Sequence, residues 1–137
     1  MNQDIGIFSQ KILPYLDEYK NNFNYFISIL IREIRTNDLI YLNLNKAWYE
    51  YNLYEKKWVD YDFKLIINQI DTFYEFFESH LEQFLKKSKL NYNNKNYLLN
   101  LNKQIIQFIK NKDFDKKIIY ENCCKLFSLN EIIYYFY

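Results

Sequence analysis

The chain has 137 residues, half of them hydrophobic and 21% aromatic, and its formal net charge is +1. This size predicts a single domain, and this composition excludes a disordered tail or a low-complexity linker. With one Gly, one Pro and one His, the chain cannot build a glycine-rich phosphate loop or a multi-histidine metal site.

The first expected elements are two helices separated by Pro14. Ile5, Phe8 and Ile12 recur at helical spacing, and Pro14 interrupts them because the residue before a proline avoids the α region. Pro14 can begin the next helix at its first position. We expect that helix to continue to residues 36–38, whose side chains can cap helices. Its apolar stripe consists of Leu16, Tyr19, Phe23, Ile27, Leu30 and Ile34.

Residues 39–62 fit two structures. Ile40, Leu44, Trp48 and Tyr51 would share one face of a helix. The same region also alternates with a period of two, and its many aromatic residues favour strands, so a β-hairpin turning at residues 52–57 is the alternative.

Residues 63–85 predict the central helix of the fold. The apolar side chains recur every three or four residues, and the helix ends near Lys86 and Lys87, where cations suit a helix C-terminus. Residues 86–96 are expected to form a loop. The apolar set is Phe63, Ile66, Ile70, Phe73, Phe77, Leu81 and Phe84.

The sign of the charge changes at this loop. Residues 1–85 carry eight basic and thirteen acidic side chains, whereas residues 86–137 carry ten basic and four acidic ones. The two halves either neutralise one another in the fold or leave one face that attracts a charged partner.

Three helical segments are expected after the loop. Apolar spacing predicts a helix over residues 98–109 and a short one over 115–126, and residues 128–131 form a capping box before an apolar run at 132–137. The sequence therefore predicts an all-α fold, a compact bundle of about five to seven helices in one domain over residues 1–137. The alternative is an α+β fold with a β-hairpin within residues 39–63.

No pattern predicts an enzyme, a metal site or a cofactor. A di-iron carboxylate motif needs a Glu three residues before its His, but the residue three before His80 is Phe77. Cys123 and Cys124 are adjacent and provide no disulfide framework, so we expect a reduced, cytoplasmic protein. There is no signal-peptide pattern, and no apolar run is long enough to span a membrane.

The surface instead predicts a non-catalytic protein-binding module, a stoichiometric inhibitor or adaptor. Four carboxylates line up at spacings of 4, 3 and 4, and aromatic residues that can anchor an interface gather before them. The expected partner is a protein with a basic surface, and homodimerisation is a further expectation. The residue usage is typical of a very AT-rich genome, and a viral or mobile-element protein that blocks a host nucleic-acid enzyme is one class that fits this bias. The proposed partner-binding residues are Asp71, Glu75, Glu78, Glu82, Trp48, Tyr51 and Trp58.

Two other functions remain open. The Lys-rich C-terminal third, with Tyr97, Phe114 and Tyr120 interleaved, could hold single-stranded nucleic acid by charge and stacking. The lysines of this alternative are Lys103, Lys110, Lys116 and Lys117. The remaining alternative is a structural or self-assembling helical protein. If they are exposed, Tyr134, Tyr135 and Tyr137 would provide aromatic side chains for such self-association.

Overall fold

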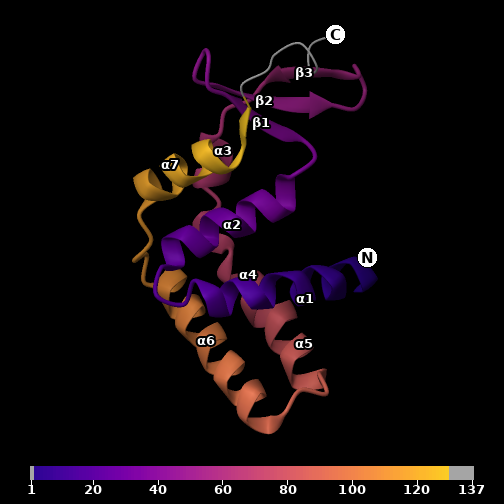
Figure 1. Ribbon diagram of the computed structural model, residues 1–137, viewed down its shortest axis with the longest axis vertical. Helices are drawn as coiled ribbons and strands as arrows, with labels where there is room; N and C mark the ends of the chain where they lie inside the picture. The colour runs from indigo at the N-terminus through magenta and orange to yellow at the C-terminus, as the bar shows by residue number, and fades with distance from the viewer. Residues whose placement is uncertain (1, 130–137) are drawn as a thin grey trace. The chain divides into compact units, whose positions relative to one another are not determined.

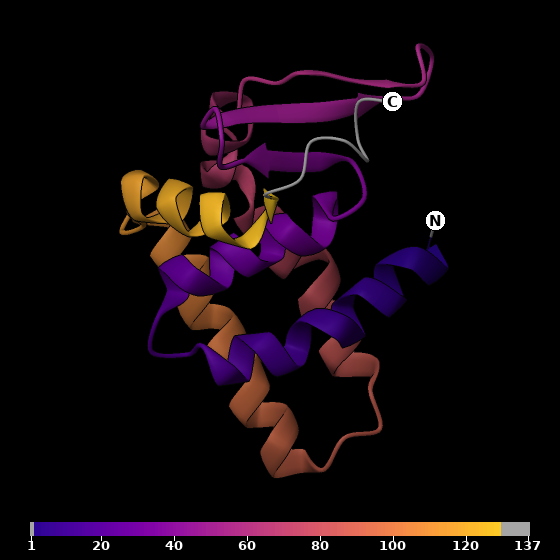
Figure 2. The same ribbon diagram turned by 45° about the horizontal axis from the view of Figure 1, so that its top comes forward.

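A computed structural model describes residues 2–129 of the chain, with side chains from residue 5 onward (Figures 1 and 2). The described part is an α+β structure with a four-stranded mixed sheet, so the all-α prediction is wrong. The chain divides into two compact units, which are described separately below. Unit 1 comprises residues 1–26 and 69–115, and unit 2 comprises residues 27–68 and 116–137.

Unit 1 is helical. It contains α1 (Asn2–Glu18), the start of α2 (Phe23–Arg35), a 3-10 turn η1 (Ile70–Thr72), and the helices α4 (Tyr74–Phe76), η2 (Phe77–Leu81), α5 (Glu82–Lys87) and α6 (Tyr92–Lys110). The apolar residues that recur at helical spacing form its core, which buries their area from water and stabilises the unit. The largest of its buried side chains are Ile12, Leu16, Phe26, Ile70, Phe77, Leu81 and Leu85.

The first helix boundary lies later than the sequence predicts. Pro14 is inside α1, and the break comes at residues 19–22 instead. Asn22 accepts a hydrogen bond from the backbone N–H of Tyr25 at 3.2 Å, as an N-cap residue does. The apolar stripe continues across this break, so spacing alone could not locate it.

The expected central helix over residues 63–85 is not one helix. It is divided into α3 (Lys64–Ile67) in unit 2, the turn η1, and a helical stretch from Tyr74 to Lys87 whose middle part, η2, is a π-helix. In η2 the backbone N–H of Glu82 bonds to the carbonyl of Phe77. That same carbonyl accepts a hydrogen bond from the buried Asn102 amide at 3.0 Å. The expected loop is also shorter, because α5 runs to Lys87 and α6 begins at Tyr92, capped by Asn91.

Unit 2 contains the sheet. Strands β1 (Leu39–Leu42), β2 (Ala47–Asn52), β3 (Lys57–Asp60) and β4 (Ser128–Leu129) lie in the order β3-β2-β1-β4 (Figure 2). The pairs β1–β2 and β2–β3 are antiparallel, whereas β4 is parallel to β1. The alternation of residues 39–62 was therefore the decisive pattern, and the β2–β3 turn falls at residues 53–56, as the hairpin alternative placed it.

The helix α7 (Lys116–Leu126) confirms the short helix expected over 115–126. The capping box expected at residues 128–131 is wrong for Ser128, which begins β4. Backbone hydrogen bonds from Tyr41 to the Phe127 carbonyl and from Asn43 to the Leu129 carbonyl hold this strand in place. The apolar run at 132–137, including Tyr134, Tyr135, Phe136 and Tyr137, lies outside the described residues.

Lysines occupy the backbone positions where glycine is usually found. Lys46 ends the β1–β2 turn with φ 51°, Lys56 ends the β2–β3 turn with φ 54°, and Lys112 follows α6 with φ 57°. The β2–β3 turn is further held by the Asn52 side chain, which accepts the backbone N–H groups of Tyr54 and Glu55.

An aromatic cluster forms the part of the unit 2 core that positions the site described below. The Trp48 ring is stacked on Phe63, with centroids 4.1 Å apart, and Phe127 meets it edge-on at 5.3 Å. Trp48 is only 5% exposed. Among the described helices, none has the length and apolar character required to cross a membrane.

Candidate functional site

The acidic residues that the sequence placed on one helical face lie in four different segments. Asp71 is in η1, Glu75 in α4, Glu78 in η2 and Glu82 in α5. A 3-10 turn and a π-helix have different numbers of residues per turn from an α-helix, so the 4-3-4 spacing does not produce the expected regular stripe. Two of the carboxylates are also paired with lysines.

Glu78 forms an ion pair with Lys110, and Glu82 forms one with Lys86 at 3.4 Å. The hydrogen bond with Glu78 is the main cause that raises the pKa of Lys110, whose ammonium group also lies 4.9 Å from the centre of the Tyr74 ring. Asp71 and Glu75 are exposed. The acidic region of unit 1 is therefore partly neutralised by lysines of the same unit.

The aromatic residues proposed as anchors differ in exposure. Trp48 lies in the core of unit 2 and cannot serve as an exposed anchor. Tyr51 and Trp58 are directly opposite one another in β2 and β3, with ring centroids 5.4 Å apart in a T-shaped arrangement. Both are half-buried, so this cross-strand pair stabilises the hairpin and leaves part of each ring accessible.

The four lysines of the nucleic-acid alternative are divided between the units. Lys103 and Lys110 are on α6 in unit 1, whereas Lys116 and Lys117 are in the first turn of α7 in unit 2. Lys110 is engaged by Glu78. Lys103 lines a small hollow of about 370 Å³ beside Phe23 and Phe108.

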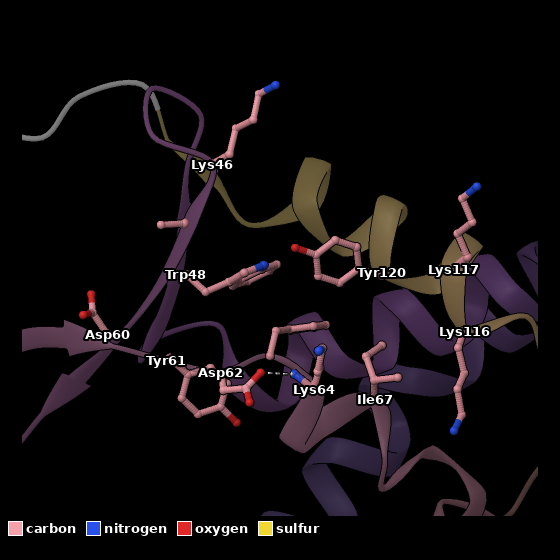
Figure 3. A pocket seen from close by; sticks show the side chains of 12 residues that line it. Lys46, Trp48, Asp60, Tyr61, Asp62, Lys64, Ile67, Lys116, Lys117 and Tyr120 are labelled. Carbon is pink, nitrogen blue, oxygen red and sulfur yellow. Dashed lines mark hydrogen bonds between the residues drawn. The ribbon is translucent and has the colours of Figure 1, made fainter.

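Lys116 and Lys117 instead line a larger hollow within unit 2, which we call the Trp48 hollow (Figure 3). Its volume is about 690 Å³. Trp48, Phe63, Ile67 and Tyr120 supply its apolar lining. Its charged lining consists of Lys46, Lys64, Lys116, Lys117, Asp60 and Asp62.

The lysines reach the Trp48 hollow from three separate segments. Lys46 comes from the β1–β2 turn, Lys64 from the first residue of α3, and Lys116 and Lys117 from the start of α7. Asp62 accepts the backbone N–H of Lys64 at 3.0 Å, which fixes the start of α3 and occupies one carboxylate oxygen. Lys46, Lys64 and Lys116 make no ion pair with any residue between 5 and 129.

Tyr120 forms a boundary of the Trp48 hollow. Its side chain is 38% exposed, and its ring meets Trp48 at 55° and Phe63 at 63°, so neither ring is stacked on its face. The Trp48 indole nitrogen is buried and faces the Tyr120 hydroxyl in Figure 3. Burial raises the pKa of Tyr120, and the interaction with the indole N–H opposes this rise.

A second hollow of about 670 Å³ adjoins the first, and we call it the Cys124 hollow. Lys46 and Tyr120 line both hollows. The remainder of its lining includes Tyr41, Cys124 and Lys125. Burial raises the pKa of Cys124, and burial raises that of Tyr41 as well, so both groups stay protonated at neutral pH.

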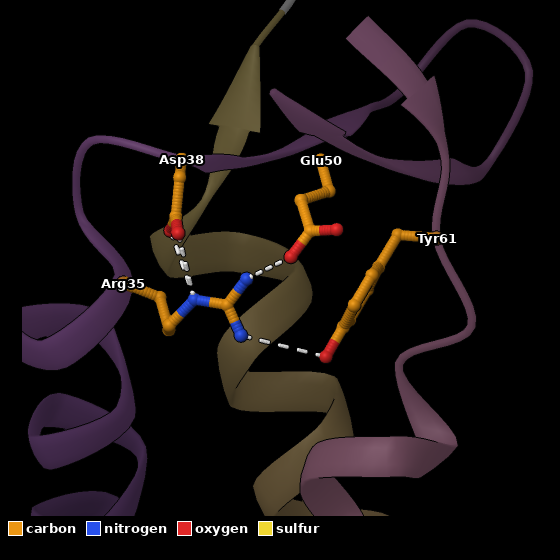
Figure 4. Close-up of polar contacts among 4 residues, drawn as sticks. All are labelled: Arg35, Asp38, Glu50 and Tyr61. Carbon is orange, nitrogen blue, oxygen red and sulfur yellow. Dashed lines mark hydrogen bonds and ion pairs between the residues drawn. The ribbon is translucent and has the colours of Figure 1, made fainter. Parts of the chain in front are cut away.

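Arg35 fixes the frame around the Trp48 hollow (Figure 4). Its guanidinium donates to Asp38 at 2.9 Å, to the Glu50 carboxylate, and to the Tyr61 hydroxyl at 3.5 Å. Burial acts to lower the pKa of Arg35, but hydrogen bonds to Asp38 and Tyr61 outweigh it and raise the pKa. Since Tyr61 also lines the hollow, this cluster joins the end of α2 and strand β2 to the wall of the site.

The residues considered for nucleophilic or metal chemistry have other surroundings. Burial raises the pKa of Cys123 to about 12, so this thiol is not a nucleophile at neutral pH. His80 is exposed and lies 6.0 Å from the Phe76 ring. Within residues 5–129, no three His, Cys, Asp or Glu side chains are grouped in a way that could hold a metal ion.

The sequence analysis missed Lys46, Lys64 and Tyr61 as site residues. They are isolated in sequence from the lysines of α7, and only the sheet and α3 bring them together, so no local spacing could have identified them. Comparisons with known proteins add no name to this site: no protein-family model matches the sequence, and a comparison with curated proteins gave no significant match.

Proposed function

We propose that this protein binds nucleic acid in the Trp48 hollow. The observation that carries the proposal is the convergence of lysines from three segments on one aromatic-lined hollow. The sequence had singled out two of these lysines, Lys116 and Lys117, together with Tyr120 for this function.

The charge of the hollow supports an anionic ligand. Four lysines line it against two aspartates, and one of the aspartates already accepts a backbone hydrogen bond. Phosphates bind to such lysines with the release of counterions, which makes the affinity fall with salt. Because lysine acts as a point charge and lacks the fork of arginine, we expect binding with little sequence preference.

The aromatic lining supports a ligand that has flat rings as well as charge. Nucleobases stack on aromatic side chains, and this contribution tolerates any sequence. The part of Tyr120 that is exposed provides such a surface at the edge of the hollow. A ligand with charge alone would gain nothing from it.

The test is binding of a fluorescein-labelled twelve-nucleotide oligothymidylate, followed by fluorescence anisotropy at several salt concentrations. With about three phosphates neutralised, the slope of log affinity against log salt should be roughly −2 for a single strand. The Lys116→Gln/Lys117→Gln variant should reduce the slope by about 1.4. The matched control is Lys103→Gln/Lys110→Gln, which removes the same charge from unit 1 and should leave the slope unchanged.

A slope near zero for the unaltered protein would reject the proposal. An equal loss in both variants would reject the Trp48 hollow as the site, because it would show a dependence on net charge alone. Circular dichroism of each variant confirms that the helices and strands remain.

The protein-binding module expected from the sequence is the second candidate. The observation in its favour is the β2–β3 turn, where Leu53 is 78% and Tyr54 is 99% exposed, next to the Tyr51–Trp58 pair. Exposed aromatic and aliphatic side chains on a hairpin are suited to contact with a partner protein. Affinity capture with the Leu53→Ser/Tyr54→Ser variant tests it, and retention of all captured partners would reject this surface.

A further inference from the structure

We infer that the ligand is single-stranded and that Tyr120 separates two consecutive bases, one in the Trp48 hollow and one in the Cys124 hollow. This inference rests on the proposed function and specifies its substrate class. It depends on three features of the site: the position of the Tyr120 ring, the size of the two hollows, and the distribution of charge along them.

The first feature is the position of the Tyr120 ring. It lines both hollows, and the neighbouring rings of Trp48 and Phe63 approach it at steep angles rather than covering its face. These two rings anchor Tyr120 at the edge of the core. An unpaired strand can accommodate a side chain between two bases without the unstacking and kinking that insertion into a duplex requires.

The second feature is the size of the two hollows. Their volumes are about 690 and 670 Å³, which lies within the range of small-ligand sites and leaves room for one nucleotide in each. Both hollows are open to solvent, as a continuous strand requires. A mononucleotide would fill only one of them.

The third feature is the distribution of charge along the two hollows. Lys116 and Lys117 lie on the Trp48 hollow, and Lys125 lies on the Cys124 hollow, all from α7. Lys46 borders both and is placed to contact the phosphate between the two bases. Lysines therefore outnumber carboxylates in both hollows, by four to two in the Trp48 hollow and, with Glu121 counted, by two to one in the Cys124 hollow.

The experiment measures competition against the labelled oligothymidylate at constant salt. Unlabelled competitors are thymidine monophosphate, the 5′-phosphorylated dinucleotide, a twelve-base-pair duplex and poly-glutamate. We expect the dinucleotide to compete at a concentration at least tenfold below that of the mononucleotide. The duplex and poly-glutamate carry charge but no unpaired bases, so each should compete less strongly per charge than the dinucleotide.

Variants of Tyr120 provide the second arm. Tyr120→Leu keeps an apolar side chain but removes the stacking surface, and it should weaken binding by roughly five- to a hundredfold. Tyr120→Phe keeps the ring and should bind as the unaltered protein does. The matched control, Tyr54→Leu, alters an exposed tyrosine away from both hollows and should have no effect.

Trp48 fluorescence in a Trp58→Phe background reports the site directly, because a base in the Trp48 hollow should change its intensity on binding. Equal competition by mononucleotide and dinucleotide, or full binding by Tyr120→Leu, would overturn this inference and leave the proposed function intact. Stronger competition by poly-glutamate than by the dinucleotide would point to an acidic peptide and overturn both. Absence of any binding to the oligothymidylate would also overturn both this inference and the proposed function.

Discussion

Replacing Lys56 by glycine should stabilise this protein. Lys56 ends the β2–β3 turn with φ 54°, a backbone conformation in which the Cβ of an L-residue is crowded. This crowding costs about 1–2 kcal/mol, whereas glycine loses about 0.5–1 kcal/mol more conformational freedom on folding. The net gain is about 0.5–1 kcal/mol.

The same argument applies to Lys46 and Lys112, whose φ values are 51° and 57°. Lys112 follows α6 in an arrangement that satisfies the last carbonyls of that helix. Its own N–H bonds to the Ile109 carbonyl, and the next N–H, of Asp113, bonds to the Phe108 carbonyl. Lys46 and Lys56 lie at opposite ends of β2, and Lys112 follows a helix of unit 1. The triple glycine variant should therefore gain about 1.5–3 kcal/mol by simple addition.

Urea unfolding followed by circular dichroism measures each gain. The control is Lys57→Gly, one residue further along, because Lys57 is an exposed residue in β3 with no such strain. It should lose about 0.5–1 kcal/mol, since glycine weakens a strand. If Lys56→Gly and Lys57→Gly destabilise the protein equally, the reasoning from backbone strain is refuted.

Three further predictions concern buried or half-buried polar groups. Arg35→Lys should cost about 1–2 kcal/mol, because an ammonium group cannot reproduce the fork that bonds Asp38 and Glu50; an unchanged urea midpoint would contradict this. Asn102→Asp should cost about 2–4 kcal/mol, since it buries a charge beside the Phe77 carbonyl, and a thermal melt that matches the unaltered protein would refute it. Between the ordinary thiol pKa of 9.0 and the folded Cys123 value of about 12, the unfolded chain loses a proton that the folded chain keeps. The free energy of unfolding should therefore fall by about 1.4 kcal/mol per pH unit above pH 9, and Cys123→Ala should reduce that slope in urea titrations between pH 8 and 10.5.

Local patterns predicted the helices where capping residues agreed with apolar spacing. The helix α7 lies where the spacing of Ile119 and Cys123 indicates it, and both residues are buried. Spacing failed where a capping side chain interrupts a continuous stripe, as Asn22 does between α1 and α2. It failed again at η2, where a contact from Asn102, distant in sequence, accompanies the π-helix.

The strands illustrate a different limit. Residues 39–62 carry both a helical and an alternating pattern, and the choice between them depends on neighbours. The alternating pattern places Trp48 against Phe63 and Phe127, and β4 adds hydrogen bonds to β1 from the other end of the sequence. A helix over these residues would provide neither these ring contacts of Trp48 nor the hydrogen bonds with β4. The tertiary contacts therefore decide the structure of this region.

The sequence by itself determined the helical character of much of the chain and singled out two lysines and the tyrosine of α7 that line the Trp48 hollow. For residues 39–62 it left a helix and a hairpin open. Apolar spacing and side-chain chemistry are local properties, so they can be read without a fold. Only the tertiary structure brought Lys46, Lys64 and Tyr61 to that hollow and paired Glu78 with Lys110. Contacts between residues distant in sequence depend on strand order, register and helix packing, which no local pattern encodes.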